Sequence, residues 1–292
     1  MRLILLMAVF SLFLHAQKIL VISSNSEVEK YKETIDGFGK NFDGPFTILD
    51  ISKMSQNAIK EYLYDEYPDI VYAVGTKAYQ YANKYIPERK IYFSSIVNWK
   101  RLPIGNERYG VSNELHSGMQ LTLIKSIFRD IDTIGVIYSK YTKDVVADLS
   151  QNAKSMGINI VSKKIDKDSL KDERLDDILE RTQAVLLIAD PVLLNDEKAV
   201  KNLFDLSRKH KKPIFAYHEL FIKYGATLAI SVDNPTIGRQ ISAMIQSTLR
   251  CENIKKIQYP AGTKVIFNKK AAKEMGLKYS KNISLISTKV VE

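Results

Sequence analysis

The sequence predicts an α/β protein made of two Rossmann-like lobes, each with a parallel sheet, and with a cleft between them. Three observations carry this prediction. Short apolar segments alternate with amphipathic, helix-length segments from residue 17 onward, which is typical of parallel sheets covered on both faces. The strand-like segments fall into two successive sets, before and after residue 113. A polar loop follows nearly every strand, at the end where ligands collect in open α/β sheets.

Length and composition are those of an ordinary globular protein. The 292 residues suffice for two domains, and 45% are hydrophobic and 26% charged. The net charge is +10, but Lys and Arg are spread over almost every expected helix. Because a nucleic-acid binder concentrates its basic residues in a stripe, we expect no nucleic-acid partner. The single cysteine, Cys251, excludes an internal disulfide and a cysteine metal cage.

The N-terminus has the three-part plan of a secretory signal. Met1 and Arg2 form a short positive region, residues 3–14 are apolar, and Ala16 is a small residue before Gln17. We therefore expect a signal peptide over residues 1–16, cleaved near Ala16, and an exported mature chain. The apolar stretch is shorter than the roughly 20 residues of a membrane-spanning helix. An uncleaved anchor is the alternative, because Leu14 is larger than the residue that usually stands there.

The unit over residues 67–82 is the clearest element of the first set. An apolar run leads into Gly75, which permits a sharp turn, and into Thr76, which can cap the following helix or bind a ligand. The same alternation places the other elements of this set. Strands are expected at 18–22, 46–50, 69–74, 90–94 and 109–112, and helices at 27–39, at 56–67 and after residue 75.

The second set carries clear start and stop signals. Ser117 with Gln120 predicts a capping box for a helix that runs to Phe128, and Gly157 is expected to end a helix over 142–156. Asn234-Pro235 opens a helix that runs to about residue 250. Strands are expected at 133–138, 158–163, 184–189, 213–217, 227–232, 264–267 and 283–287, and further helices at 172–182, 196–210 and 269–275.

The helix that begins at Asn234 follows a set of strands that is already complete, so it can return to the first lobe. We expect the first lobe to comprise residues 17–113 with the helix 234–256. The second lobe then comprises residues 114–233 with the C-terminal segment 257–292. Hinges are expected near 112–117, 232–234 and 256–260.

Catalytic motifs are sparse in this sequence. No two of the four histidines have metal-ligand spacing, and neither a nucleophile elbow nor a phosphate-binding glycine loop occurs. His218 and Glu219, the close His–carboxylate pair, are interpreted as a surface pair outside the residues that contact a ligand. We therefore expect no enzymatic activity, cofactor or metal. The catalytic alternative, an exported hydrolase or isomerase, would have to use Asp190, His218 and Glu219.

The polar loops at the strand ends indicate a small polar ligand. If the two rims face each other, acids can hold an ammonium group and hydroxyl groups can hold a carboxylate, which predicts an amino acid or a similar zwitterion. The acids are Asp190 and Asp233, and the hydroxyl groups belong to Ser24, Thr76 and Ser95. Aromatic side chains either stack on the ligand or belong to the core. These are Trp99, Tyr109, Tyr138 and Tyr217.

A series of segments, in order and over essentially the whole mature chain, resembles the substrate-binding proteins of bacterial ABC importers, in the group with tryptophan/tyrosine-type members. The segments are P-D-I-V-Y-A-V-G-T-K-A (68–78), N-E-R-Y-G-V-S (106–112), I-G-V-I-Y-S (134–139), K-P-I-F-A-Y (212–217), G-A-T-L-A-I-S-V-D (225–233), I-G-R-Q (237–240) and F-N-K-K-A-A-K-E-M-G (267–276). The resemblance implies a type I periplasmic binding fold with hinge closure, a periplasmic monomer, and an ABC permease in the inner membrane as partner. The alternative role is a periplasmic ligand-sensing module that feeds a membrane receptor or histidine kinase.

The resemblance also implies a set of ligand-binding positions. Carried over by position, they are Ser24, Thr76, Ser95, Ser112, Tyr138, Asp190, Tyr217 and Asp233. The chain departs from the family near the expected pocket: Val97-Asn98-Trp99 replaces the usual V-x-D-P, and Tyr109 stands where Thr is common. The aromatic amino acids known as ligands in the family therefore do not carry over directly.

Overall fold

The structure is a computed structural model that describes residues 17–166 and 172–292. The expected signal peptide, residues 1–16, lies outside the described residues. None of the helices in the described ranges combines the length and the apolar character that crossing a membrane requires.

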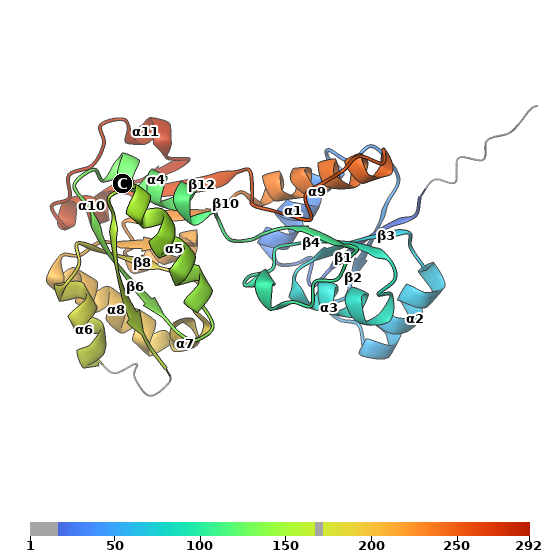
Figure 1. The fold of residues 1–292 in the computed structure, drawn as a ribbon, viewed down its shortest axis with the longest axis horizontal. Coiled ribbons are helices and arrows are strands. Elements are labelled where there is room, and N and C mark those ends of the chain that lie inside the picture. The colour runs from blue at the N-terminus through green and yellow to red at the C-terminus, as the bar shows by residue number, and fades with distance from the viewer. Residues whose placement is uncertain (1–16, 167–171) are drawn as a thin grey trace, which may run out of the picture.

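The chain forms two sheets, each flanked by helices, and they lie side by side along the long axis of the molecule (Figure 1). One sheet has six strands in the order β11-β5-β4-β3-β1-β2, and the other has seven in the order β13-β12-β10-β9-β8-β6-β7. We call each sheet with its helices a lobe. The predicted α/β class with two Rossmann-like lobes is confirmed.

The first lobe has helices on both faces of its sheet. Helices α1 and α9 pack on one face over Tyr72 and Tyr92, and α2 and α3 cover the other face. Its elements are β1 (Ile19–Ser23), α1 (Glu29–Gly39), β2 (Thr47–Asp50), α2 (Gln56–Glu66), β3 (Ile70–Val74), α3 (Thr76–Tyr85), β4 (Lys90–Ser94), η1 (Trp99–Arg101), β5 (Arg108–Val111), α9 (Asn234–Leu249) and β11 (Ile257–Gln258).

The second lobe is built in the same way. Helices α4 and α5 pack on one face of its sheet, and α6, α7 and α8 pack on the other. Its elements are α4 (Ser117–Ile127), β6 (Thr133–Tyr138), α5 (Lys143–Ser155), β7 (Asn159–Lys164), α6 (Asp172–Glu180), β8 (Ala184–Leu187), α7 (Pro191–Leu194), α8 (Glu197–His210), β9 (Ile214–Ala216), η2 (Glu219–Tyr224), β10 (Leu228–Val232), β12 (Thr263–Asn268), α10 (Lys269–Glu274), α11 (Ile283–Ile286) and β13 (Lys289–Val291).

The described chain passes between the lobes at three places: between β5 and α4, between β10 and α9, and between β11 and β12. Ile257 pairs with Gly110 of β5, so β11 belongs to the first lobe. The predicted assignment of residues from 257 onward to the second lobe is wrong for this strand. Strand β12 then pairs antiparallel with β10. Because β12 runs antiparallel to β10, it begins where β10 ends, and a short link from β11 is enough to reach it. A parallel strand would need a long crossover to the opposite end of the sheet.

Helix α9 packs against α1 through backbone contact. A Cβ atom on Gly238 would lie 1.9 Å from the carbonyl oxygen of Thr34, and one on Gly37 would lie 2.2 Å from that of Pro235. Glycine at both positions therefore sets the distance between the two helices. At the start of α9, the side-chain amide of Asn234 donates a hydrogen bond of 2.8 Å to the Glu33 carboxylate.

Two local predictions were wrong. The segment expected as a strand at 283–287 contains α11, because Ile283 and Ile286 pack on the same core cluster at helical spacing and the Ser287 amide donates to the Ile283 carbonyl. The expected capping box of α4 does not form. His116 is the N-cap and accepts from the Gly118 amide at 3.2 Å, while the Ser117 hydroxyl donates to Asp148 at 2.5 Å.

Candidate functional site

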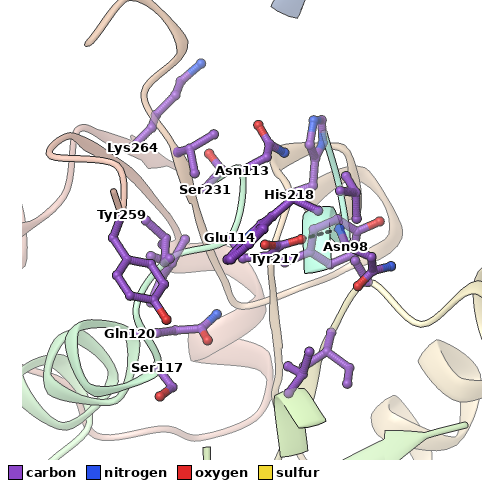
Figure 2. A pocket seen from close by; sticks show the side chains of 18 of the residues that line it. Asn98, Asn113, Glu114, Ser117, Gln120, Tyr217, His218, Ser231, Tyr259 and Lys264 are labelled. Carbon is purple, nitrogen blue, oxygen red and sulfur yellow. Dashed lines mark hydrogen bonds between the residues drawn. The ribbon is translucent and has the colours of Figure 1, made fainter. Parts of the chain in front are cut away.

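A cavity of about 470 Å³ lies between the two lobes. This volume falls within the roughly 300–1,000 Å³ of small-molecule sites. Its walls come from α1 and the β4–β5 loop of the first lobe, from α4, α5, β10 and the loops after β8 and β9 of the second lobe, and from the three crossovers. Figure 2 shows side chains from several of these segments around one space.

Two of the predicted ligand-binding residues line this cavity, Tyr217 and Asp233. Tyr217 follows β9, and burial raises the pKa of its hydroxyl group. Asp233 follows β10 and accepts a hydrogen bond from the Thr236 amide at 3.1 Å, which caps α9. One carboxylate oxygen is thus engaged at the helix start, while the residue remains part of the cavity wall.

The predicted residues Ser24 and Thr76 both lie at the start of α3, and neither lines the cavity. Gly75, with φ of 91°, is the N-cap of α3, and no cap bond comes from the exposed Thr76. The hydroxyl of Ser24 accepts from the Ala78 amide at 3.0 Å. The loop after β1 therefore supplies the cap bond of α3, and Thr76 does not form the cap that was one of its two predicted roles.

The buried hydroxyl groups of Ser95 and Ser112 bond within the first lobe and the first crossover. Ser95 lies 3.3 Å from the Thr34 hydroxyl and has a left-handed backbone with φ of 59°. Ser112 donates to the Glu114 carboxylate at 2.8 Å. Neither serine lines the cavity in this structure.

Asp190 is fully buried, and its carboxylate accepts four internal hydrogen bonds. Val192 and Leu193 amides donate to one oxygen at 2.9 and 3.1 Å, which caps α7. The donors to the other oxygen are the Ser139 amide at 2.6 Å and the Thr142 hydroxyl at 2.5 Å. The remaining predicted residue, Tyr138, packs against the core cluster beneath α4 and α5. The ligand-binding roles of the eight residues stay predictions.

His218 and Glu219 both line the cavity. Both are exposed, as a surface pair should be, but the surface to which they belong is the cavity wall. Partial desolvation by the surrounding cavity wall lowers the pKa of His218, although its side chain is exposed, and the charges of Lys30 and Lys264 act in the same direction, against that of Glu219. Glu219 forms an ion pair with Lys264 at 2.9 Å.

The two walls of the cavity carry opposite charge. Cations predominate on the first-lobe wall, which holds Lys30, Lys100, Arg101 and Glu33. Acids predominate on the second-lobe wall, which holds Asp144, Asp148, Glu219 and Lys264. Among the described residues, the half-buried Lys30 forms no ion pair, and burial lowers the pKa of its ammonium group.

The first crossover contributes a carboxyl group at the centre of the view in Figure 2. Glu114 accepts hydrogen bonds from the Asn98 amide and the Ser112 hydroxyl. Burial raises the pKa of Glu114, and these bonds and the charge of Lys100 act against that effect. Asn98 has φ of 57°, so Glu114 holds a strained loop of the first lobe against the crossover. Sequence reasoning missed Glu114, although it stands two residues beyond a predicted site serine.

A possible metal-ligand cluster lies away from the cavity. Asp176 and Glu180 of α6 and His210 of α8 place one ligand atom each within 4.8 Å of one another. His210 lies 2.5 Å from Asp176, and Lys209 pairs with the same carboxylate at 3.6 Å. These contacts of Asp176 join α6 to α8.

Comparison with known proteins gives one family and several solved structures of similar fold. The profile of the family described as ABC transporter substrate binding protein matches residues 42–291. No curated protein matches the sequence. Similar solved structures include an ABC domain in complex with L-Trp from Streptococcus pneumonia, at 18% identity and TM-score 0.64, covering 94% of this chain and 100% of that one.

Two further structures extend the comparison. The ligand-free, open structure of CD0873, a substrate binding protein with adhesive properties from Clostridium difficile, has 16% identity and TM-score 0.73, with 94% and 99% coverage of this chain and that one. GanP, a glucose-galactose binding protein from Geobacillus stearothermophilus, has 11% identity and TM-score 0.53, with 86% and 97% coverage. At these identities the likeness concerns the fold, and it confirms the type I periplasmic binding architecture.

Proposed function

We propose a function for this chain on the premise that it belongs to the ABC transporter substrate binding protein family. It is the exported solute-binding component of an importer and binds an amino acid or a similar zwitterion in the cavity between its lobes. It delivers this ligand to an ABC permease in the inner membrane, acts as a periplasmic monomer after removal of residues 1–16, and performs no catalysis.

The charge arrangement of the cavity carries this proposal. A zwitterion can direct its carboxylate to the cationic first-lobe wall and its ammonium group to acids of the second lobe or the crossovers. A neutral sugar gains nothing from this opposition. The similar structure with bound L-Trp supports the zwitterion class, while the glucose-galactose binding protein shows that the fold also serves sugars.

The first experiment identifies the ligand. We would purify the chain from Gln17 onward, analyse released small molecules by mass spectrometry, and record thermal melts with amino acids, sugars, peptides and nucleosides. A ligand at about 100 times its dissociation constant stabilises the folded state by roughly 2.7 kcal/mol. We expect stabilisation by at least one amino acid. Stabilisation by sugars alone, or by no compound in the panel, would contradict the proposal.

Lys30 provides a specific test of the cationic wall. Lys30→Met removes the half-buried ammonium group while keeping much of the apolar stem, so we expect amino-acid affinity to fall about tenfold or more by calorimetry. Lys60→Met is the matched control, because Lys60 is exposed on α2 and does not line the cavity. Equal affinities of the two variants would show that Lys30 takes no part in binding.

A further inference from the structure

Asn113 lines the cavity, and its side-chain oxygen is buried without a donor from the described part of the protein. Its side-chain oxygen is one of four buried polar side-chain atoms there that lack a hydrogen-bond partner. The others belong to Ser23, Arg89 and Glu107, and of the four residues only Asn113 lines the cavity. An unpaired buried acceptor costs roughly 1–3 kcal/mol. Such an unpaired acceptor on a residue of the cavity wall points to a donor that the described chain does not supply.

The next residue, Glu114, adds at the same place a half-buried carboxylate that forms no ion pair with another described residue. Its two oxygens each accept one hydrogen bond, from the Asn98 amide and the Ser112 hydroxyl. An ionised carboxylate can accept about four, so both oxygens keep free acceptor capacity. In the described ranges, no Lys, Arg or His lies within ion-pair distance of Glu114, and the charge of Lys100 acts on it from farther away. A half-buried carboxylate of this kind is stabilised by a cation that comes closer to it than Lys100 does.

Both residues belong to the crossover from β5 to α4, and Figure 2 shows them beside each other. This crossover connects the lobes, so a group bound to it can stay bound while the two cavity walls approach each other. Two other acids were considered for this role, and both form hydrogen bonds within the fold. Asp190 uses its carboxylate in four internal bonds, and Asp233 caps α9.

We infer that the side-chain oxygen of Asn113 and the carboxylate of Glu114 form an acceptor pair that binds the ammonium group of the ligand. This inference rests on the proposed function and narrows it: the ligand carries a free, protonated amine. N-acylated and deaminated analogues lack the positive charge and its set of N–H donors, and they leave the acceptor pair unpaired. Sites that leave buried polar groups unpaired reject such analogues strongly.

The test uses calorimetry on the mature chain with the twenty L-amino acids, and then with the N-acetyl and deaminated counterparts of those that bind. We expect the free amino acid to bind at least 100-fold more tightly than either counterpart. Glu114→Gln keeps the size of the side chain and removes its charge, so it should weaken binding of the free amino acid tenfold or more. Its effect on the deaminated counterpart should be less than threefold.

Glu66→Gln is the matched control, since Glu66 is a half-buried carboxylate on α2 that pairs with Lys18, away from the cavity. A thermal melt without ligand separates binding from structure. If Glu114 binds the ammonium group, Glu114→Gln removes a desolvated charge and should leave the melting temperature unchanged or raised. If Glu114 only holds the loop of Asn98 in place, the melting temperature should fall.

The outcomes separate the inference from the proposed function. If wild type binds an amino acid and Glu114→Gln binds it equally well, or if the N-acetyl counterpart binds as tightly, the acceptor pair is refuted and the proposed function stands. If wild type binds none of the twenty amino acids, both are refuted. A lower melting temperature of Glu114→Gln with unchanged discrimination between the amine and its counterparts also refutes the acceptor pair.

Discussion

The Asp50 carboxylate fixes the loop that leads from β1 into α1. Its two oxygens accept from the Ser26 and Ser52 amides, both at 2.7 Å. Burial alone would raise the pKa of Asp50, but the hydrogen bonds from Ser52 and Ser26 outweigh it and lower the pKa to about 2. Strand β2, at the edge of the sheet, is thereby joined to the segment that carries Ser24 and positions α1.

This bond set predicts a pH-dependent stability. Because the pKa is lower in the folded state, ionised Asp50 stabilises the fold above the unfolded pKa, and the effect disappears as pH falls toward 2. Asp50→Asn should cost roughly 1 kcal/mol at pH 6 after solvent screening, and clearly less at pH 3. Urea unfolding at both pH values measures this. An equal cost at both would contradict the assignment, and Asp36→Asn, exposed on α1, is the control.

Single side chains were the hardest part to predict from sequence. A Gly-Thr turn suggests that Thr76 caps its helix, but the cap bond comes from Ser24, which only strand pairing brings close. Glu114 has no motif of its own. Its importance depends on the left-handed Asn98 backbone and on burial at a crossover, and neither can be read from residue types.

At the scale of elements, the contact between α1 and α9 is set by two glycines. Gly238→Ala would force a Cβ atom into the backbone of α1. We therefore expect the free energy of unfolding to fall by about 1–3 kcal/mol or more. Gly105→Ala is the control, because its Cβ would meet Arg108 at an ordinary 3.9 Å, and it should change stability by less than about 0.5 kcal/mol. Denaturant titration compares them, and similar values for both variants would contradict close packing.

The regular elements were predictable because strands and helices here obey their periodicities. The strands at 70–74 and 133–138 are buried apolar runs, and α8 keeps one apolar face. The C-terminal tail was less predictable. The short segment at 283–286 reads as a strand by composition, and packing on the second-lobe core makes it a helical turn. The two-residue strand β11 has no signal beyond its partner β5.

At the scale of the whole molecule, the opposite charges of the cavity walls favour approach of the lobes. We expect the radius of gyration from small-angle scattering to decrease when a binding amino acid is added, as hinge closure requires. The decrease should need more ligand in 1 M salt, where the screening length falls to about 3 Å. An unchanged radius of gyration at saturating ligand would mean that binding occurs without closure. Wild type with a non-binding amino acid is the control.

The return of α9 to the first lobe also has a consequence for biogenesis. Helix α1 meets its partner only after about 200 further residues have been made, and the edge strand β11 arrives later still. Contacts so distant in sequence form slowly, and domains with a late-arriving segment cannot finish while the nascent chain is short. Neither lobe can be completed before residue 258 has emerged. On the export route proposed above, the polypeptide therefore remains threadable through a translocation pore until nearly its whole length has been synthesised.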